Sequence, residues 1–202
     1  MRFNIRHLVA ALVLVVAIPS LRGQDSWDTS FKLCGGQMTS AKDARLGTGF
    51  SWALAMEGAF PILPKGSLVM ELGYRTLGTN TTTISTTLKE DDWSKGFYGS
   101  VLYRHTDFHG FWEGLYLHGG LRYNTLESFR ETTSKGTGPA GTDVRTEVRG
   151  RSTHNIGPLA GVGFRFNDKI SLEANVSQVK GRNLDQVEKS GTMLELALGM
   201  HL

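Results

Sequence analysis

The sequence predicts an all-β protein: an eight-stranded antiparallel up-and-down transmembrane β-barrel. One observation is the alternation of apolar residues with small or polar ones, clearest at residues 194–202, which read LELALGMHL. A strand places alternate side chains on opposite faces, so such a segment has one apolar face. The pattern recurs in about eight segments of roughly ten residues, and the connections alternate between long and short, as in outer-membrane barrels.

Residues 1–23 are predicted to be a signal peptide. Basic residues precede an apolar run at 8–18, and Pro19 ends the run. The run is shorter than the roughly 20 residues that a membrane-spanning helix needs, and it has the arrangement of a secretory signal. The barrel domain is then expected to comprise residues 24–202.

Charge and cysteine content exclude some classes of protein. Without Arg2, Arg6 and Arg22 of the predicted signal peptide, the 22 basic residues become 19, equal to the 19 acidic residues. A neutral chain gives no electrostatic support for a nucleic-acid partner. Cys34 is the single cysteine, so no disulfide can form within the chain.

The strands are expected at residues 27–37, 47–60, 67–77, 96–106, 111–124, 153–166 and 170–177, with a last strand after residue 190. Residues 78–95 are expected to be a long threonine-rich connection. The longest connection, 125–152, still alternates at its flanks, which allows both neighbouring strands to continue beyond the membrane. In outer-membrane barrels the short turns face the periplasm and the longer loops face outward, and we expect that orientation here.

The two strand faces decide between a barrel in lipid and a soluble barrel of the lipocalin kind. A soluble barrel is polar outside, but here the less apolar face is rich in Gly, Ala and Ser, which suits a narrow lumen. The apolar face carries aromatic residues near the strand ends, as expected at the two membrane interfaces. The short-turn belt is predicted to contain Trp27, Phe60, Tyr103, Phe111 and Phe166, and the long-loop belt Phe50, Tyr74, Phe97 and Tyr123.

Charged residues occur at inward positions of the predicted strands. A buried charge without a partner is costly, so opposite charges are expected to pair across the lumen as an ionic plug. A gated or narrow pore with switchable ion pairs remains the functional alternative. The residues are Glu57, Glu71, Arg104, Arg165 and Glu173 toward the short turns, and Arg75, Arg122 and Glu195 nearer the long loops.

Two segments carry a resemblance to a known class: GLYLHGGLRY at 114–123 and PLAGVGFRF at 158–166. With the strand pattern, they make the chain resemble the small eight-stranded outer-membrane barrels of the OmpX/Ail and OmpA-transmembrane-domain type. The resemblance implies a monomer in the outer membrane of a Gram-negative-type bacterium, in contact with outer-membrane lipid and inserted by the outer-membrane insertion machinery. It also implies a structural or adhesion role, with an extracellular protein partner bound through the long loops.

Two other functions remain open at this point. One is a narrow channel for small or apolar solutes, as in OmpW-like barrels. The other is a lipid A-modifying hydrolase, because Ser152 and His154 share the outward face of one strand. A hydrolase needs an acid to orient its base, and the outward residue expected beside them on the next strand is Gln178. No histidine pair has the spacing of a zinc site, so the sequence predicts no catalytic residue, metal or cofactor.

Overall fold

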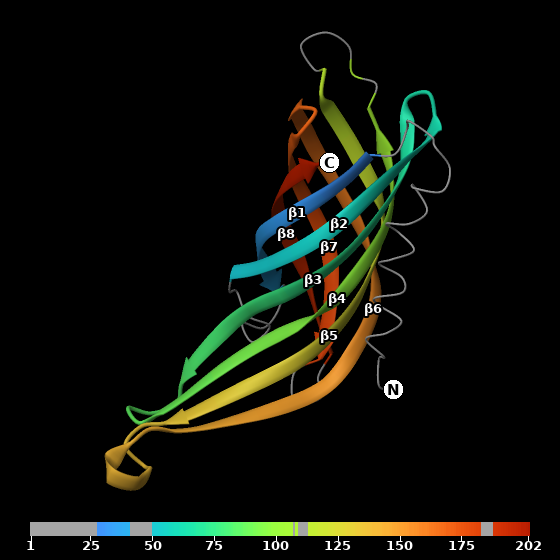
Figure 1. Cartoon of the computed structure of the whole chain (residues 1–202). Helices are drawn as coiled ribbons and strands as arrows, with labels where there is room; N and C mark the ends of the chain where they lie inside the picture. Colours follow the sequence, from blue (N-terminus) through green and yellow to red (C-terminus); the bar gives the residue numbers. More distant parts are fainter. Residues whose placement is uncertain (1–27, 41–49, 107, 109–112, 183–187) are drawn as a thin grey trace, which may run out of the picture.

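The computed structural model describes residues 28–40, 50–106, 108, 113–182 and 188–202, and these residues form a closed barrel of antiparallel strands (Figure 1). The predicted signal peptide lies outside the described residues. Every strand pairs with its neighbours in sequence, and β8 closes the barrel against β1, which confirms the predicted fold class. The strands are β1 (Asp28–Ser40), β2 (Phe50–Leu63), β3 (Gly66–Thr83), β4 (Leu88–His105), β5 (Leu115–Ser134), β6 (Val144–Asn167), β7 (Ile170–Arg182) and β8 (Glu188–His201).

The alternation in the sequence corresponds to the two faces of the barrel wall. Outward residues such as Leu117 and Leu198 are exposed, whereas inward residues such as Val69 and Ala197 are buried in the lumen. The outer face is therefore apolar, and the lumen holds most of the buried charged side chains. Among the described residues, no helix has the length and apolar character to cross a membrane.

Two strand pairs extend beyond the strand bounds expected from the sequence, and for one of them the sequence pattern predicts a connection instead. Most of residues 78–95, expected to be a connection, instead continue β3 and β4, which pair as far as Thr83 and Lys89 and leave only residues 84–87 as the connection. Alternation is lost there because every residue of β4 from 88 to 95 is half-buried, so neither of its faces is the covered one. The threonine run at 81–83 retains the preference of β-branched residues for strands. β5 and β6 pair as far as Ser134 and Val144, as the flanks of the longest connection allow.

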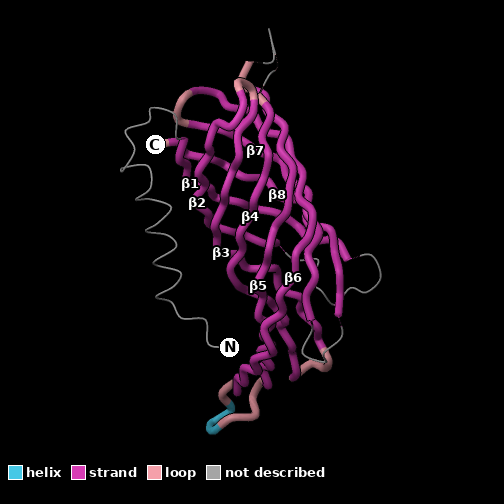
Figure 2. The backbone as a smooth tube through the Cα atoms, turned by 90° about the vertical axis from the view of Figure 1, so that its right-hand side faces the viewer, coloured by secondary structure: helices cyan, strands magenta, loops and turns pink. Residues whose placement is uncertain are grey.

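These extensions form a sheet that stands beyond the barrel, and we call it the protruding sheet. It comprises the outer parts of β3 to β6, at residues 78–83, 88–95, 127–134 and 144–152. The β5–β6 hairpin, with a short 3-10 helix at Pro139–Gly141, reaches farthest of the described elements (Figures 1 and 2). The connections thus divide the barrel into a long-loop end and a short-turn end.

Small residues on the inward face make room for large side chains in the lumen. A Cβ atom at Gly73 would lie 2.5 Å from the ring of Tyr98, and one at Gly163 would lie 2.2 Å from the ring of Tyr116. Both tyrosines are buried. The glycine-rich inward face is therefore the complement of two inward tyrosines, which together with charged side chains fill the narrow barrel.

Candidate functional site

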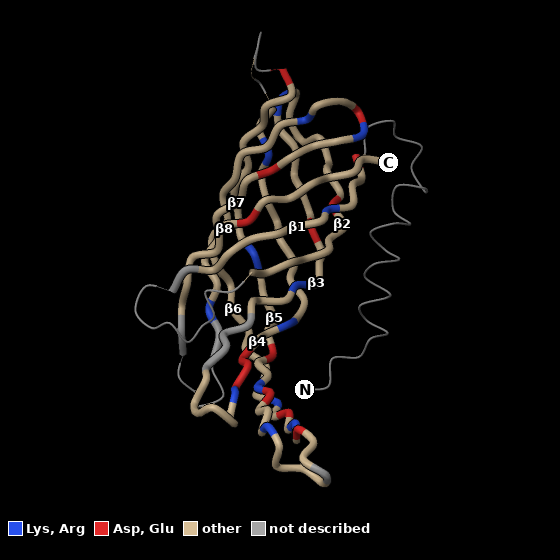
Figure 3. The backbone as a smooth tube through the Cα atoms, turned by 90° about the vertical axis from the view of Figure 1, so that its left-hand side faces the viewer, with Lys and Arg blue, Asp and Glu red and all other residues tan. Residues whose placement is uncertain are grey.

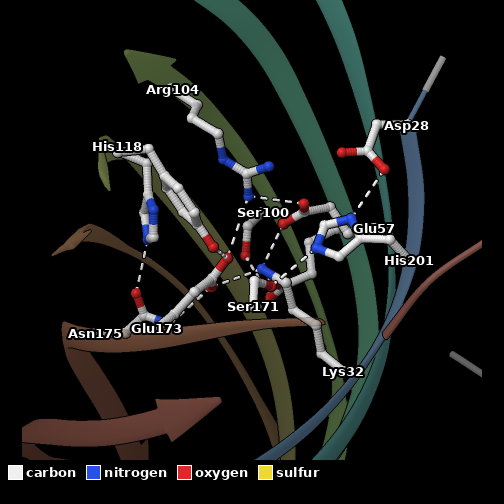
Figure 4. Close-up of polar contacts among 12 residues, drawn as sticks. Asp28, Lys32, Glu57, Ser100, Arg104, His118, Ser171, Glu173, Asn175 and His201 are labelled. Carbon is white, nitrogen blue, oxygen red and sulfur yellow. Dashed lines mark hydrogen bonds and ion pairs between the residues drawn. The ribbon is translucent and has the colours of Figure 1, made fainter. Parts of the chain in front are cut away.

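A group of ionised side chains crosses the lumen, with Lys32 of β1 near its middle (Figure 4). The Lys32 Nζ atom lies 2.6 Å from Glu173 Oε2 and 3.4 Å from Glu71 Oε2, and it also forms an ion pair with Glu57. All four side chains are buried. One ammonium group thus holds together carboxylates from β2, β3 and β7.

Arg104 of β4 completes this half of the group. Its Nη2 atom lies 2.7 Å from Glu57 Oε1 and 3.2 Å from Glu173 Oε1. The Tyr116 hydroxyl donates a hydrogen bond of 2.8 Å to the same Glu173 oxygen. Two cations from β1 and β4 are therefore shared between the same carboxylates.

A second half lies nearer the long-loop end. Arg122 bonds to Glu71 at 2.9 Å and to Glu195 at 3.3 Å, and Arg75 bonds to Glu195 at 3.1 Å. The guanidinium carbons of Arg75 and Arg122 lie 4.2 and 4.5 Å from the centre of the Tyr98 ring, on which both cations pack. Glu71 contacts both Lys32 and Arg122, so the halves form one network.

We call this network the lumen cluster; its members are Lys32, Glu57, Glu71, Arg75, Arg104, Arg122, Glu173 and Glu195. It contains four cations and four carboxylates, so its formal charges cancel. Charges removed from water are tolerated when they are paired and hydrogen-bonded in this way.

The membership of the lumen cluster differs from the sequence prediction at two residues. Arg165 is predicted in it and lies elsewhere, and Lys32 belongs to it without having been predicted. Arg165 is expected among the clustered charges, but it instead forms an ion pair with Asp28 at the short-turn end, and its side chain is 36% exposed. The register puts Arg165 one row beyond Glu173, too near the end of β6. Lys32 takes its place in the charge balance. Its inward parity could have indicated this, but which residues share a level depends on strand stagger.

Asp28, His201 and Ser171 form a hydrogen-bonded chain at the short-turn end (Figure 4). His201 Nδ1 lies 2.9 Å from an Asp28 oxygen, and His201 Nε2 lies 2.9 Å from Ser171 Oγ. This is the order of groups in a serine hydrolase triad. Ser171, however, is only 1% exposed, so a substrate has no access to its hydroxyl in this structure. The chain instead ties together the ends of β1, β7 and β8.

A cluster of apolar side chains fills the lumen on the long-loop side of the charges. Its members are Met38, Leu77, Leu126, Val179 and Met193, and each is at most 5% exposed. Arg75 joins this layer to the charges by donating a hydrogen bond of 3.0 Å to the Met193 sulfur. An ionic layer and an apolar layer therefore both occupy the lumen.

Seven of the nine predicted interface aromatics lie in the described residues, and Trp27 and Phe111 lie outside them. Toward the long loops, Tyr74 and Phe97 are register partners whose rings meet edge to face at 5.1 Å. Phe50, Phe97, Tyr103, Tyr123 and Phe166 are exposed on the outer face, and Phe60 is half-buried. Their proposed contact with the membrane interfaces remains a prediction.

The Ser152–His154 pair lies on the outer face of β6. His154 Nδ1 is 2.8 Å from the Tyr123 hydroxyl, and the two rings stack. An acid does lie beside Ser152, but on β5 rather than β7: Glu127 is its register partner. Arg149 holds that carboxylate, with Nη2 at 2.6 Å from Oε2. The geometry therefore favours an interfacial polar pair over a catalytic one. No group of potential metal ligands occurs in the part of the chain that the structure describes.

The protruding sheet carries charges of both signs (Figure 3). Arg130 bonds to both oxygens of Asp92, at 2.7 and 3.0 Å. Phe129 stacks on Trp93 at 5.8 Å, and Lys95 lies over the Phe129 ring at 4.3 Å. The sheet therefore has an ordered arrangement of side chains of its own outside the barrel.

Comparison with known proteins yields matches among solved structures. No protein-family profile and no curated protein matches the chain. The chain is similar to Ail, the attachment invasion locus protein of Yersinia pestis, with 13% identity and a TM-score of 0.47 over 88% of this chain and 98% of that one. It is similar to Neisserial surface protein A, with 13% identity and a TM-score of 0.47 over 87% and 96%. The N-terminal β-barrel domain of Pseudomonas aeruginosa OprF matches at 14% identity and a TM-score of 0.41 over 87% and 97%.

Proposed function

We propose that this chain is a non-enzymatic outer-membrane β-barrel of a Gram-negative-type bacterium whose protruding sheet takes part in interactions at the cell surface. The observation that carries the proposal is the outer part of β6. Its residues 144–149 are all exposed, so neither face is covered. An exposed strand with an open edge is a template for pairing with another chain.

Placement in a membrane is supported by the outer face of the barrel. Large apolar side chains are exposed there on every strand, among them Leu54, Leu121, Val176 and Leu196. A soluble protein rarely exposes so extensive an apolar surface. Such a face is favourable in contact with lipid chains. Aromatic residues near both ends of the strands are also typical of a membrane barrel.

A closed lumen favours the surface role over the narrow channel. The lumen cluster is buried and its charges are paired, and the apolar cluster fills the lumen on its long-loop side. An ion crossing such a lumen would have to separate the paired charges and then pass through the layer of apolar side chains. We therefore expect no steady conductance.

The test uses the full barrel refolded into planar bilayers and into vesicles. We expect no steady current across the bilayer. Trypsin added outside vesicles should cut the protruding sheet at exposed cations such as Arg145 and leave the barrel intact. A steady current would replace this proposal with the narrow channel, and a protruding sheet protected from trypsin in every molecule would exclude a role at the surface.

A further inference from the structure

We infer that the open edge of β6 pairs antiparallel with the same edge of a second copy of this chain on a facing membrane, about a two-fold axis at Thr146. The inference rests on the proposed function and names the partner of that same surface. Figures 1 and 2 show the β5–β6 hairpin extending away from the barrel, where a facing copy can reach it.

One edge of this segment is paired and the other is open. Val144 to Arg149 pair with β5 on one side, from Ser134 to Phe129. On the other side, β7 pairs with β6 only from Leu159 onward, and within the described residues no strand pairs with this segment there. Its free backbone groups can therefore complete their hydrogen bonds with another strand.

The sequence of this edge is complementary to itself. A two-fold axis perpendicular to a sheet sets the residue on the axis opposite its own copy, and the residue before it opposite the residue after it. With the axis at Thr146, Arg145 meets Glu147 twice and Val144 meets Val148 twice. Opposite charges, paired β-branched residues and paired threonines are all favourable cross-strand neighbours.

The flanking positions continue the same complementarity. Asp143 precedes the strand and meets Arg149 in this register, again twice. The alternating signs at 143, 145, 147 and 149 are therefore matched throughout the paired segment.

Other registers lose this match. An axis at Arg145 or Glu147 sets that charge opposite its own copy, which is unfavourable. An axis at Val148 sets Glu147 opposite Arg149, but beyond Arg149 the register of β6 shifts before Ser152, so regular pairing stops there. An axis at Val144 loses the contacts between Arg145 and Glu147. Charge complementarity therefore selects Thr146.

The direction of β6 decides where the second copy stands. The strand runs from the tip of the hairpin toward the barrel, so copies in one membrane run the same way. Antiparallel pairing requires a copy that runs in the opposite direction, as on a facing membrane. A single short edge pairs weakly, but many copies on two facing surfaces act together.

The experiment measures clustering of phosphatidylcholine vesicles that carry the refolded chain, followed by light scattering. Parent vesicles should cluster, and Arg145→Glu or Glu147→Arg should each lose at least tenfold in clustering rate. The two single variants should cluster with each other, because their charges are then opposite. The double variant should cluster with itself but not with the parent. Lys89→Glu, a matched charge reversal away from the edge, should cluster like the parent.

Cross-linking tests the register in a Cys34→Ser background. Thr146→Cys should form reducible dimers between clustered vesicles, because directly opposite Cβ atoms lie near disulfide distance. Thr132→Cys is the control, since Thr132 is the partner of Thr146 within one chain and lies away from the open edge. Equal cross-linking of both variants would overturn the register.

The outcomes separate the inference from the proposed function. If the parent inserts and trypsin reaches its protruding sheet but its vesicles do not cluster, self-pairing is overturned and the surface role stands. If the parent clusters but the charge reversals at Arg145 and Glu147 do not change clustering as expected, self-pairing through this edge is likewise overturned. A chain that does not insert, or whose sheet is inaccessible, contradicts both.

Discussion

At the scale of single residues, the lumen depends on charges that share partners. Lys32 contacts three carboxylates, from Glu57, Glu71 and Glu173. Removing the cation would leave these carboxylates facing one another in a space with little water. A buried charge that loses its partner destabilises far more than an exposed one.

Lys32→Met is expected to lower the free energy of unfolding by about 3–5 kcal/mol, the usual loss for a broken buried ion pair. Lys89→Met is the matched control, because Lys89 pairs with Asp91 but its side chain is 43% exposed. The control should lose only about 0–1 kcal/mol. Urea unfolding in lipid vesicles measures both. Adding Glu57→Gln to Lys32→Met should recover part of the loss, and no recovery would contradict the shared pairing.

Arg104 and Arg165 carry the same charge but should contribute differently to the stability of the barrel. Arg104 is buried between Glu57 and Glu173, whereas Arg165 pairs with Asp28 where water has access. Arg104→Ala is therefore expected to destabilise the barrel more than Arg165→Ala in the same unfolding experiment. The reverse order would place Arg165 in the lumen cluster after all.

Gly163 tests the fit of the lumen around Tyr116. Gly163→Val would force its side chain into the Tyr116 ring, since even the Cβ atom would lie 2.2 Å away. Overpacking of this kind costs about 1–3 kcal/mol of stability. Gly119→Val is the control, because its Cβ atom would have its nearest neighbour at 3.6 Å. If Gly163→Val lost no more stability than Gly119→Val, the lumen would accommodate the larger side chain.

At the scale of elements, the strands of the barrel wall are expected to face lipid, whereas their continuations in the protruding sheet are expected to face water. Leu117 of β5 is 47% exposed on the barrel wall, and Val148 of β6 is 48% exposed on the protruding sheet. Their exposed fractions are nearly equal, yet Leu117 is expected to face lipid chains and Val148 to face water. Exposure alone therefore does not say what a charge would cost at either site.

Arginine substitution distinguishes the two solvents. Leu117→Arg should destabilise the barrel in vesicles by about 2–4 kcal/mol if it lies near the bilayer midplane. Val148→Arg should be nearly neutral, because its side chain remains in water. Unfolding free energies of the two variants provide the comparison, and equal values would contradict the membrane placement of the β5 wall.

At the scale of the whole molecule, barrel and protruding sheet are separate parts of one set of strands. The buried clusters lie within the barrel, and the farthest of their residues along β5 is Leu126. Replacing residues 130–148 by a short turn should therefore leave the urea midpoint unchanged and remove the trypsin sites at Arg130, Lys135 and Arg145. A large drop in the midpoint would show that the protruding sheet supports the barrel.

Much of this arrangement follows from residue order. Alternation places Glu71 and Arg122 inward and Leu117 outward, because strand side chains have a period of two. It cannot place Lys32 beside Glu173, which lies on a strand far along the chain. It also cannot extend β4 outward to Leu88, because residues 88–95 are all half-buried and lack the one-sided burial that produces alternation.

The sequence by itself determined the class of fold, the face of each barrel residue and the sign of the charges in the lumen, since these depend on local periodicity. Only the tertiary structure decided which charges share a level, that Arg165 belongs to the short-turn end, and that no strand of the described residues pairs with the second edge of β6 at 144–149. These depend on the stagger between strands and on where pairing with β7 stops. Stagger arises from closing the barrel, and no single strand contains it.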